Sequence, residues 1–307
     1  MASDPQDSSI PGPAPIDARL PVLDAGLVRR LIAGQFPDWA GLPVQAMHPQ
    51  GHDNRSFRLG EALLVRLPSA QRYAGQVAKE QHWLPILAAG LPVEIPQPVA
   101  LGRAAEGYPI DWSIYRWLPG RVLAPGDDLS RLAGDLARVL RALQGQPVAG
   151  APAAGPQNFH RGGDLRVYDA ETRRFAGTLP RGHDRDAVLA IWNRALTTSW
   201  QHAPVWLHGD LAPGNLLMRD GRLAALIDFG NCAIGDPAAD LALAWSLLDA
   251  PARAAFRLAL RFDPATWERA RGWALWKALS MLHEGPCPAA ETCLAQLLAE
   301  ADPDAGG

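Results

Sequence analysis

Residues 205–230, VWLHGDLAPGNLLMRDGRLAALIDFG, constrain the fold more than any other part of this chain. Two short apolar runs each lead to a polar position: Asp210 follows the first run, and Asp228 ends the second. Between the runs lies Asp220-Gly221, a dipeptide that strongly favours a tight hairpin turn. The hairpin brings Asn215, at the start of its first strand, close to Asp228, at the end of its second strand. We therefore expect two carboxylates and a carboxamide to converge at one edge of a small sheet, around a positively charged group.

The composition is that of a soluble globular protein. The chain has 307 residues, of which 48% are apolar and 20% are charged, which predicts two compact lobes. No apolar run approaches the ~20 residues that a membrane span requires, so we expect no membrane association. Residues 1–22 are acidic and rich in Pro and Ser, without the basic and apolar regions of a signal peptide. They predict a disordered tail on a cytoplasmic protein.

Charge and cysteine content exclude several classes of site. The net charge of −3 provides no electrostatic reason to bind nucleic acid. The three cysteines show no metal-ligand spacing, so neither disulfides nor zinc are indicated. The basic residues are almost all arginines, the two lysines being Lys79 and Lys277. The oligomeric state is left open.

Periodicity divides the chain into two parts. Residues 23–118 show a helix, short strands and one inserted helix, which predicts a β-rich domain. Residues 119–307 are mainly helical, with the hairpin segment interrupting them. Within this part we expect a single helix over 237–249 and a long loop over 155–175. The fold class is α+β, with a small β-rich lobe joined by a short connector to a larger helical lobe.

The polar positions of the hairpin segment match a known arrangement. His208-Gly209-Asp210 is separated from Asn215 by four residues, and Asp228-Phe229-Gly230 follows. Protein kinases show the same spacing in their H-R-D-x-x-x-x-N and D-F-G motifs. The segment resembles the aminoglycoside phosphotransferase family, relatives of the protein kinases that phosphorylate small molecules. The likeness covers most of residues 43–300 and implies a bilobal protein-kinase-like fold that uses ATP and Mg²⁺.

The resemblance implies a role for each polar residue. Asp210 would accept or orient the proton of the substrate hydroxyl, and Asn215 and Asp228 would hold Mg²⁺ through oxygen ligands. His208 would brace the catalytic loop. Asp240 matches a buried aspartate that hydrogen-bonds this loop.

The expected phosphate contacts depart from the kinase pattern. Only Gly51 remains where protein kinases have three glycines, and Ser56 is a candidate phosphate donor together with nearby backbone amides. Lys79 and Glu80 are neighbours on one helix and point about 100° apart, so they cannot face one site. We therefore expect Arg66, on a strand, to pair with Glu80 and to replace the kinase lysine.

The connector IYRWLPG matches the segment that binds adenine in this family. Its backbone C=O and N–H groups at Arg116 and Leu118 would meet the adenine edge, with Tyr115 behind the pocket.

These expectations describe an ATP- and Mg²⁺-dependent phosphotransferase acting on a hydroxyl of a small molecule, with an aminoglycoside-type antibiotic as acceptor. A metabolite kinase for an amino alcohol, sugar or homoserine-like compound is the alternative, and a nucleotide-binding pseudokinase is a third. Asp164 and Glu284 could meet the ammonium groups of an amino sugar, or could simply form a solvated surface.

Overall fold

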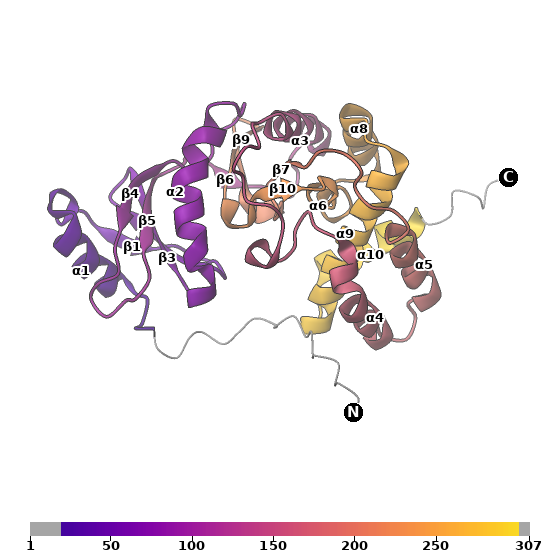
Figure 1. The fold of residues 1–307 in the computed structure, drawn as a ribbon, viewed down its shortest axis with the longest axis horizontal. Coiled ribbons are helices and arrows are strands. Elements are labelled where there is room, and N and C mark those ends of the chain that lie inside the picture. The colour runs from indigo at the N-terminus through magenta and orange to yellow at the C-terminus, as the bar shows by residue number, and fades with distance from the viewer. Residues whose placement is uncertain (1–19, 301–307) are drawn as a thin grey trace. The chain divides into compact units, whose positions relative to one another are not determined.

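The computed structural model describes residues 20–300 (Figure 1). The predicted N-terminal tail therefore lies almost entirely outside the described residues. The chain divides into two compact units. The first contains residues up to 81 together with 97–117, and the second contains residues 82–96 together with those from 118 onward.

The first unit is built on an antiparallel sheet of five strands in the order β1-β2-β3-β5-β4. The strands are β1 (Val44–Ala46), β2 (Asn54–Leu59), β3 (Leu63–Pro68), β4 (Pro98–Gly102) and β5 (Trp112–Arg116). Helix α1 (Ala25–Gln35) precedes them, and the carboxylate of Asp24 caps it by accepting from Leu27 N at 2.8 Å. Helix α2 (Ala74–Ala88) follows β3, and its first half belongs to this unit.

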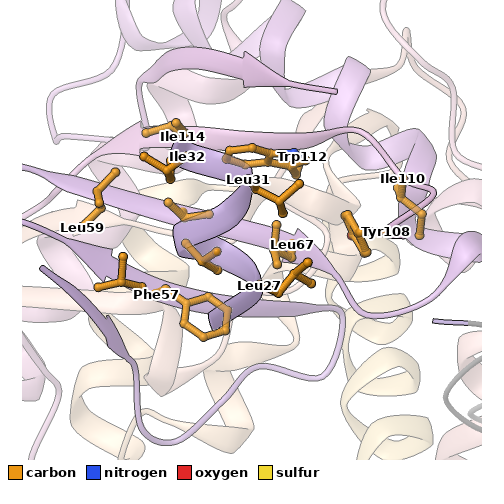
Figure 2. Close-up of a cluster of buried hydrophobic side chains, with 13 residues drawn as sticks. Leu27, Leu31, Ile32, Phe57, Leu59, Leu67, Tyr108, Ile110, Trp112 and Ile114 are labelled. Atoms are coloured by element: carbon orange, nitrogen blue, oxygen red, sulfur yellow. The ribbon is translucent and has the colours of Figure 1, made fainter. Parts of the chain in front are cut away.

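The core of the first unit lies between α1 and one face of the sheet (Figure 2). Phe57 and Leu59 of β2 and Leu67 of β3 are buried there against Leu31 of α1. Side chains alternate between the two faces of a strand. The residues next to these in each strand, which include Ser56 and Arg66, therefore point to the opposite face.

Residues 82–96, which the sequence placed in the β-rich lobe, belong instead to the second unit. The reason is a backbone ladder around Glu94. Glu94 N donates to Ala224 O at 2.9 Å, and Leu226 N donates to Glu94 O at 3.0 Å. The segment after α2 is thus hydrogen-bonded to β9 (Arg222–Leu226), which lies more than a hundred residues further along the sequence.

The second unit is mainly helical and contains two small sheets. The helices are α3 (Leu129–Gln144), α4 (Asp169–Thr178), α5 (Arg185–Ala195), α6 (Ala238–Leu241), α7 (Leu243–Ser246), α8 (Ala250–Leu260), α9 (Pro264–Glu284) and α10 (Pro288–Ala299). The strands are β6 (Arg121–Val122), β7 (Val205–Leu207), β8 (Leu216–Arg219), β9 (Arg222–Leu226) and β10 (Ala233–Gly235). β6, β8 and β9 form one antiparallel sheet, and β7 pairs with β10.

The predicted hairpin is present as β8 and β9. Asp220 and Gly221 both have positive φ, 52° and 71°, as a type I′ turn requires, and Arg219 pairs with Arg222 across it. Asp135 of α3 fixes the hairpin by accepting from Arg222 Nη2 at 2.6 Å and from Leu223 N at 3.2 Å. This anchoring holds the strands that carry the polar residues of the site.

Two local predictions were wrong. The single helix expected over 237–249 is two short helices, α6 and α7, separated by a turn at Ala242, and the second of them ends at Ser246. The long loop expected over 155–175 contains two 3-10 turns and then the start of α4, at Asp169. Asp169 and Glu171 lie in the first turn of α4, where carboxylates favour helix formation. Among residues 20–300, no helix is both long enough and apolar enough to cross a membrane.

Candidate active site

A buried carboxylate binds the backbone of the loop that follows β7. Asp240 of α6 accepts from His208 N at 2.7 Å and from Gly209 N at 2.8 Å. Gly209 has φ +83°, and a Cβ there would lie 2.4 Å from Asn231 O, so the tight approach requires glycine. Burial raises the pKa of Asp240, while His208 and the two backbone N–H groups oppose that shift. The structure therefore places Asp240 where the sequence expected a loop anchor.

The ring of His208 connects the two polar loops. Its Nδ1 accepts from Asp210 N at 3.2 Å, and its Nε2 lies 3.0 Å from Ile227 O. This pattern requires the tautomer that carries its proton on Nε2. The ring is fully buried and packs on Phe229 with centroids 4.5 Å apart. His208 has the position of a structural brace, because both of its nitrogens are used within the protein.

Asp210 lies at the end of this braced loop with its side chain 32% exposed. Its Oδ1 is 2.8 Å from Nζ of Lys277, on α9. Burial alone would raise the pKa of Asp210, but the ion pair with Lys277 and the nearby charge of Arg161 outweigh burial and lower it. Asp210 is therefore ionised at neutral pH and can accept a proton from a hydroxyl group.

Asn215 and Asp228 are brought together by the hairpin. Ile227 N donates to Asn215 O at 3.0 Å, so the residue before Asp228 is bonded to Asn215. The Nδ2 of Asn215 donates to Asp210 O at 2.9 Å, which leaves Oδ1 as the oxygen available to a cation. Asp228 has φ 69° and ψ 62°, a left-handed conformation that non-glycine residues adopt at a cost and that is frequent at functional sites.

This donor set fits Mg²⁺. Mg²⁺ prefers oxygen ligands and is usually held by one or two carboxylates, with phosphate and water oxygens completing the shell. Within residues 20–300 no cluster of three His, Cys, Asp or Glu side chains could hold a metal alone. Asn215 and Asp228 would therefore hold the ion together with ligands that arrive with the nucleotide.

In the first unit, Arg66 and Glu80 are in contact. Arg66 Nη1 lies 3.4 Å from Glu80 Oε1, with both side chains largely buried, as the sequence pairing predicted. The hydroxyl of Tyr115 donates to the other oxygen of Glu80. Burial and the Glu80 charge raise the pKa of Tyr115 well above its ordinary value, so Tyr115 is a hydrogen-bond donor at all accessible pH values. Glu80, on α2, is thus held by Arg66 of β3 and Tyr115 of β5, and it orients Arg66.

Ser56 and Arg116 have backbone N–H groups that are already hydrogen-bonded within the protein. Ser56 lies directly opposite Arg66 in the β2–β3 register, but its backbone N–H already donates to Gln50 Oε1 at 2.8 Å. Only the hydroxyl of Ser56 remains a candidate phosphate donor. The N–H of Arg116 likewise donates to Gln97 O at 2.9 Å, so it is not available to adenine. The backbone N–H groups of Ser56 and Arg116 are thus used within the first unit, and the contact of Ser56 with phosphate stays a prediction that concerns its hydroxyl.

The backbone N–H and C=O of Leu118 are both available to bind a ligand. Within the described part of the chain, neither its N–H nor its C=O has a hydrogen-bond partner. Its side chain is buried in a small apolar cluster with Leu217, Ala225 and Ile227. The cluster fixes the backbone at Leu118, which leaves a donor and an acceptor in defined positions.

Sequence reasoning missed Lys277 and Arg161. Lys277 is one of two lysines in the chain, and it is the only charge in the stretch WALWKALSML, which was the available signal. Arg161 lies in the segment expected to be a loop, among several other arginines, and nothing in the local sequence distinguishes it. Cavities of about 370 and 250 Å³ also occur in the second unit, lined by residues such as Trp200 and Arg269. Asp164 lines the smaller cavity, but neither cavity is lined by Asp210, Asn215 or Asp228.

Comparison with solved structures shows the fold. The GDP and kanamycin complex of APH(2")-IIia superposes with a TM-score of 0.67 at 22% identity, covering 90% of this chain and 97% of that one. Macrolide 2'-phosphotransferase MphH from Brachybacterium faecium gives a TM-score of 0.60 at 21% identity, covering 88% and 97%. The streptomycin–ATP–APH(2")-IIa ternary complex gives 0.58 at 16% identity, covering 87% and 93%. At these identities the superpositions show a shared kinase-like fold and no more.

A search of curated proteins found no match. The model of the phosphotransferase enzyme family, APH, matches residues 46–273, which include the polar residues of both units described above. The match covers more than half of the chain and contains the motifs that form the loop, the hairpin and the Arg66–Glu80 pair. This chain therefore belongs to the phosphotransferase enzyme family.

Proposed function

We propose that this protein transfers the γ-phosphate of ATP to a hydroxyl group of a small molecule. The observation that carries the proposal is the arrangement at the end of β7. Asp210 is ionised, partly exposed and bonded through its backbone to both His208 and Asn215. A carboxylate held in this way can position and deprotonate a hydroxyl without further rearrangement of the loop.

The residues around Asp210 have separate tasks in this proposal. Asp240 and His208 hold the loop rigid, so that Asp210 meets the hydroxyl at a fixed place. The hydroxyl oxygen forms a bond to the γ-phosphorus, the bond from that phosphorus to the β–γ bridging oxygen breaks, and the proton passes to Asp210. Asn215 and Asp228 would hold Mg²⁺. The ion would supply positive charge that offsets the negative charge of the phosphate groups.

The nucleotide contacts that we propose come from Arg66, Ser56 and Leu118. Arg66 is oriented by Glu80 and can make bidentate bonds to phosphate oxygens. The hydroxyl of Ser56 lies on the same sheet face, and Leu118 offers one donor and one acceptor to the edge of a base. Structures of related fold contain GDP, ADP or ATP, which supports a purine nucleotide as donor.

The acceptor is proposed at the level of a small hydroxyl compound. Neighbours of the same fold are complexed with kanamycin, streptomycin or gentamicin, which supports testing an antibiotic acceptor first. The candidate acceptors differ in charge: aminoglycosides are polycations, sugars are neutral, and a homoserine-like compound carries a carboxylate. The charged side chains around Asp210 therefore help to decide between these classes of acceptor.

Incubation of the purified chain with ATP, Mg²⁺ and a panel of hydroxyl compounds tests the proposal. The panel contains aminoglycosides, macrolides, sugars, sugar acids and amino alcohols. The expected result is acceptor-dependent ADP release together with a new phosphomonoester signal in the ³¹P NMR spectrum. Tight nucleotide binding without phosphorylation of any panel member would instead favour a pseudokinase.

A further inference from the structure

Two cations lie close to the carboxylate of Asp210. Lys277 reaches it from α9 at 2.8 Å. The second cation is Arg161, in the segment before α4, whose guanidinium lies over the ring of Trp276, the residue next to Lys277. Its positive charge also acts on Asp210. In this unit the ionised carboxylate of Asp210 is therefore paired with one cation, and a second cation lies nearby.

Arg161 is held in place by aromatic rings. Its Cζ lies 4.3 Å from the ring centroid of Trp276 and 5.5 Å from that of Trp273. Both tryptophans belong to α9, one turn or less from Lys277. An arginine stacked on aromatic faces keeps its position and still offers its planar N–H groups to a ligand.

The guanidinium of Arg161 has unsatisfied hydrogen-bonding capacity. Its Nε is buried and has no hydrogen-bond partner, and within residues 20–300 no carboxylate lies within ion-pair distance of it. Burial lowers the pKa of Arg161, although the charges of Tyr168, Asp210 and Glu171 oppose that shift. A partly buried cation whose Nε has no hydrogen-bond partner is costly, and an incoming oxyanion would reduce that cost.

The carboxylates of the same region are already engaged. Asp164 caps a short turn and pairs with Arg166 at 2.9 Å, and Asp169 pairs with Arg173 at 2.8 Å. Glu171 accepts from Trp276 Nε1 at 2.8 Å.

Glu284 is exposed at the end of α9, two helical turns beyond Lys277, which is roughly 10 Å along the helix axis. The expectation that acidic residues receive the ammonium groups of an amino sugar therefore has little support at the position of the base.

We propose that the acceptor carries an oxyanion, a carboxylate or a phosphate, close to the hydroxyl that is phosphorylated, and that Arg161 and Lys277 bind this oxyanion. The inference rests on the proposed function and specifies its substrate class. Lys277 has three donors, so it can keep its bond to Asp210 while donating to the acceptor. Arg161 supplies the second cation at the same place. Polycationic aminoglycosides meet like charges in this arrangement and are poor acceptors.

The test uses sets of hydroxyl compounds that differ only in charge. One set is glucuronate, glucose and glucosamine, and a second is glycerate, glycerol and 3-amino-1,2-propanediol. Glucose 6-phosphate and glycerol phosphate form a separate arm that distinguishes a phosphate from a carboxylate. Binding is measured by isothermal titration calorimetry on the full chain, and phosphate transfer from ATP is measured in parallel by ³¹P NMR.

The variants are Arg161→Met and Lys277→Met, which remove the charge but keep much of the side-chain volume. Arg181→Met is the matched control, because Arg181 is exposed and makes no hydrogen bond or ion pair within the described residues. Arg161→Lys retains the charge without the planar fork. Each lost charged hydrogen bond corresponds to about a 10- to 100-fold change in affinity.

The proposal predicts that acidic members bind the wild type, and that neutral and amino members bind at least about tenfold more weakly. Arg161→Met should weaken the acidic members by about 10- to 100-fold, Arg161→Lys should recover part of that loss, and Arg181→Met should have no effect. Preference for the amino members, failure of every acidic member to bind, or an acidic preference that survives both variants would overturn it. Binding of an acidic member without phosphate transfer would leave this inference standing and contradict the proposed function.

Discussion

Lys277 and Asp210 form an ion pair of 2.8 Å between two elements that are 67 residues apart in the sequence. The pair is partly exposed, at 37% for Lys277 and 32% for Asp210. It makes the lysine a determinant of the protonation state of the proposed base. This relationship leads to the first prediction.

Lys277→Met should move the acidic limb of the kcat/KM profile to higher pH. Burial raises the pKa of Asp210, and Lys277 is the strongest of the charges that reverse this shift. Without Lys277 burial dominates, the pKa rises, and Asp210 becomes protonated at a higher pH during acidification. Because kcat/KM reports the free enzyme, its acidic limb follows that pKa. An unchanged limb in Lys277→Met, with Lys277→Arg as the charge-preserving control, would show that Asp210 is not the titrating base.

Asp228→Asn should reduce turnover strongly while the free energy of unfolding changes little. Asp228 lies in a loop at the end of β9, and its carboxylate is proposed to bind Mg²⁺ with Asn215. Replacing a charged ligand by a neutral one weakens a hard cation site. The measurement is nucleotide affinity as a function of Mg²⁺ concentration, which should become much flatter in the variant. Wild-type Mg²⁺ dependence would remove Asp228 from the metal site.

Arg66→Ala should impair nucleotide use far more than Lys79→Ala. Arg66 is bonded to Glu80 and largely buried, and we propose that it contacts phosphate oxygens. Arg66→Lys should recover part of the activity, since a point charge replaces some of the bidentate contact. The measurement is KM for ATP at saturating acceptor. KM should be highest for Arg66→Ala, lower for Arg66→Lys and lowest for Lys79→Ala. If Lys79→Ala is the most damaging change, the assignment of the phosphate-binding cation is wrong.

Asp240→Asn should lower the free energy of unfolding by about 1–3 kcal/mol. Both oxygens of Asp240 accept backbone N–H groups, and an asparagine can accept only one of them at this buried position. The other N–H is then left without a partner and faces a second donor. Urea denaturation followed by tryptophan fluorescence measures the change, with the exposed Asp186→Asn as the control. Equal stability of the two variants would mean that Asp240 does not support the loop.

Local signals in the sequence were sufficient to predict the hairpin and the polar loop that precedes it. Asp220-Gly221 predicts the hairpin turn, and the turn sets the pairing register of β8 and β9. That register places Asn215 beside Ile227, the residue before Asp228. The Arg66–Glu80 pairing followed from helix geometry together with the scarcity of lysine. These features depend on short-range rules, such as turn type and the angle between neighbouring helical residues.

What the sequence did not reveal depends on distant contacts. Lys277 meets Asp210 only because α9 packs beside the loop after β7, and no spacing in the sequence records that contact. The hydrogen bonds from the backbone N–H groups of Ser56 and Arg116 to Gln50 and Gln97 likewise depend on the folded structure and have no signal in the sequence. The boundary between the units was misplaced for the same reason, since Glu94 pairs with a strand far along the chain.

Replacement of Asp210 by Ala tests the central claim most directly, with turnover and nucleotide affinity measured on the same preparation. Asp210 is proposed to act on the acceptor hydroxyl and not to bind the nucleotide. Turnover should therefore fall by the ~10²–10⁴-fold typical of a lost general base, while the nucleotide dissociation constant stays nearly unchanged. Full activity in Asp210→Ala, or loss of nucleotide binding together with activity, would contradict the assignment of this loop as the catalytic site.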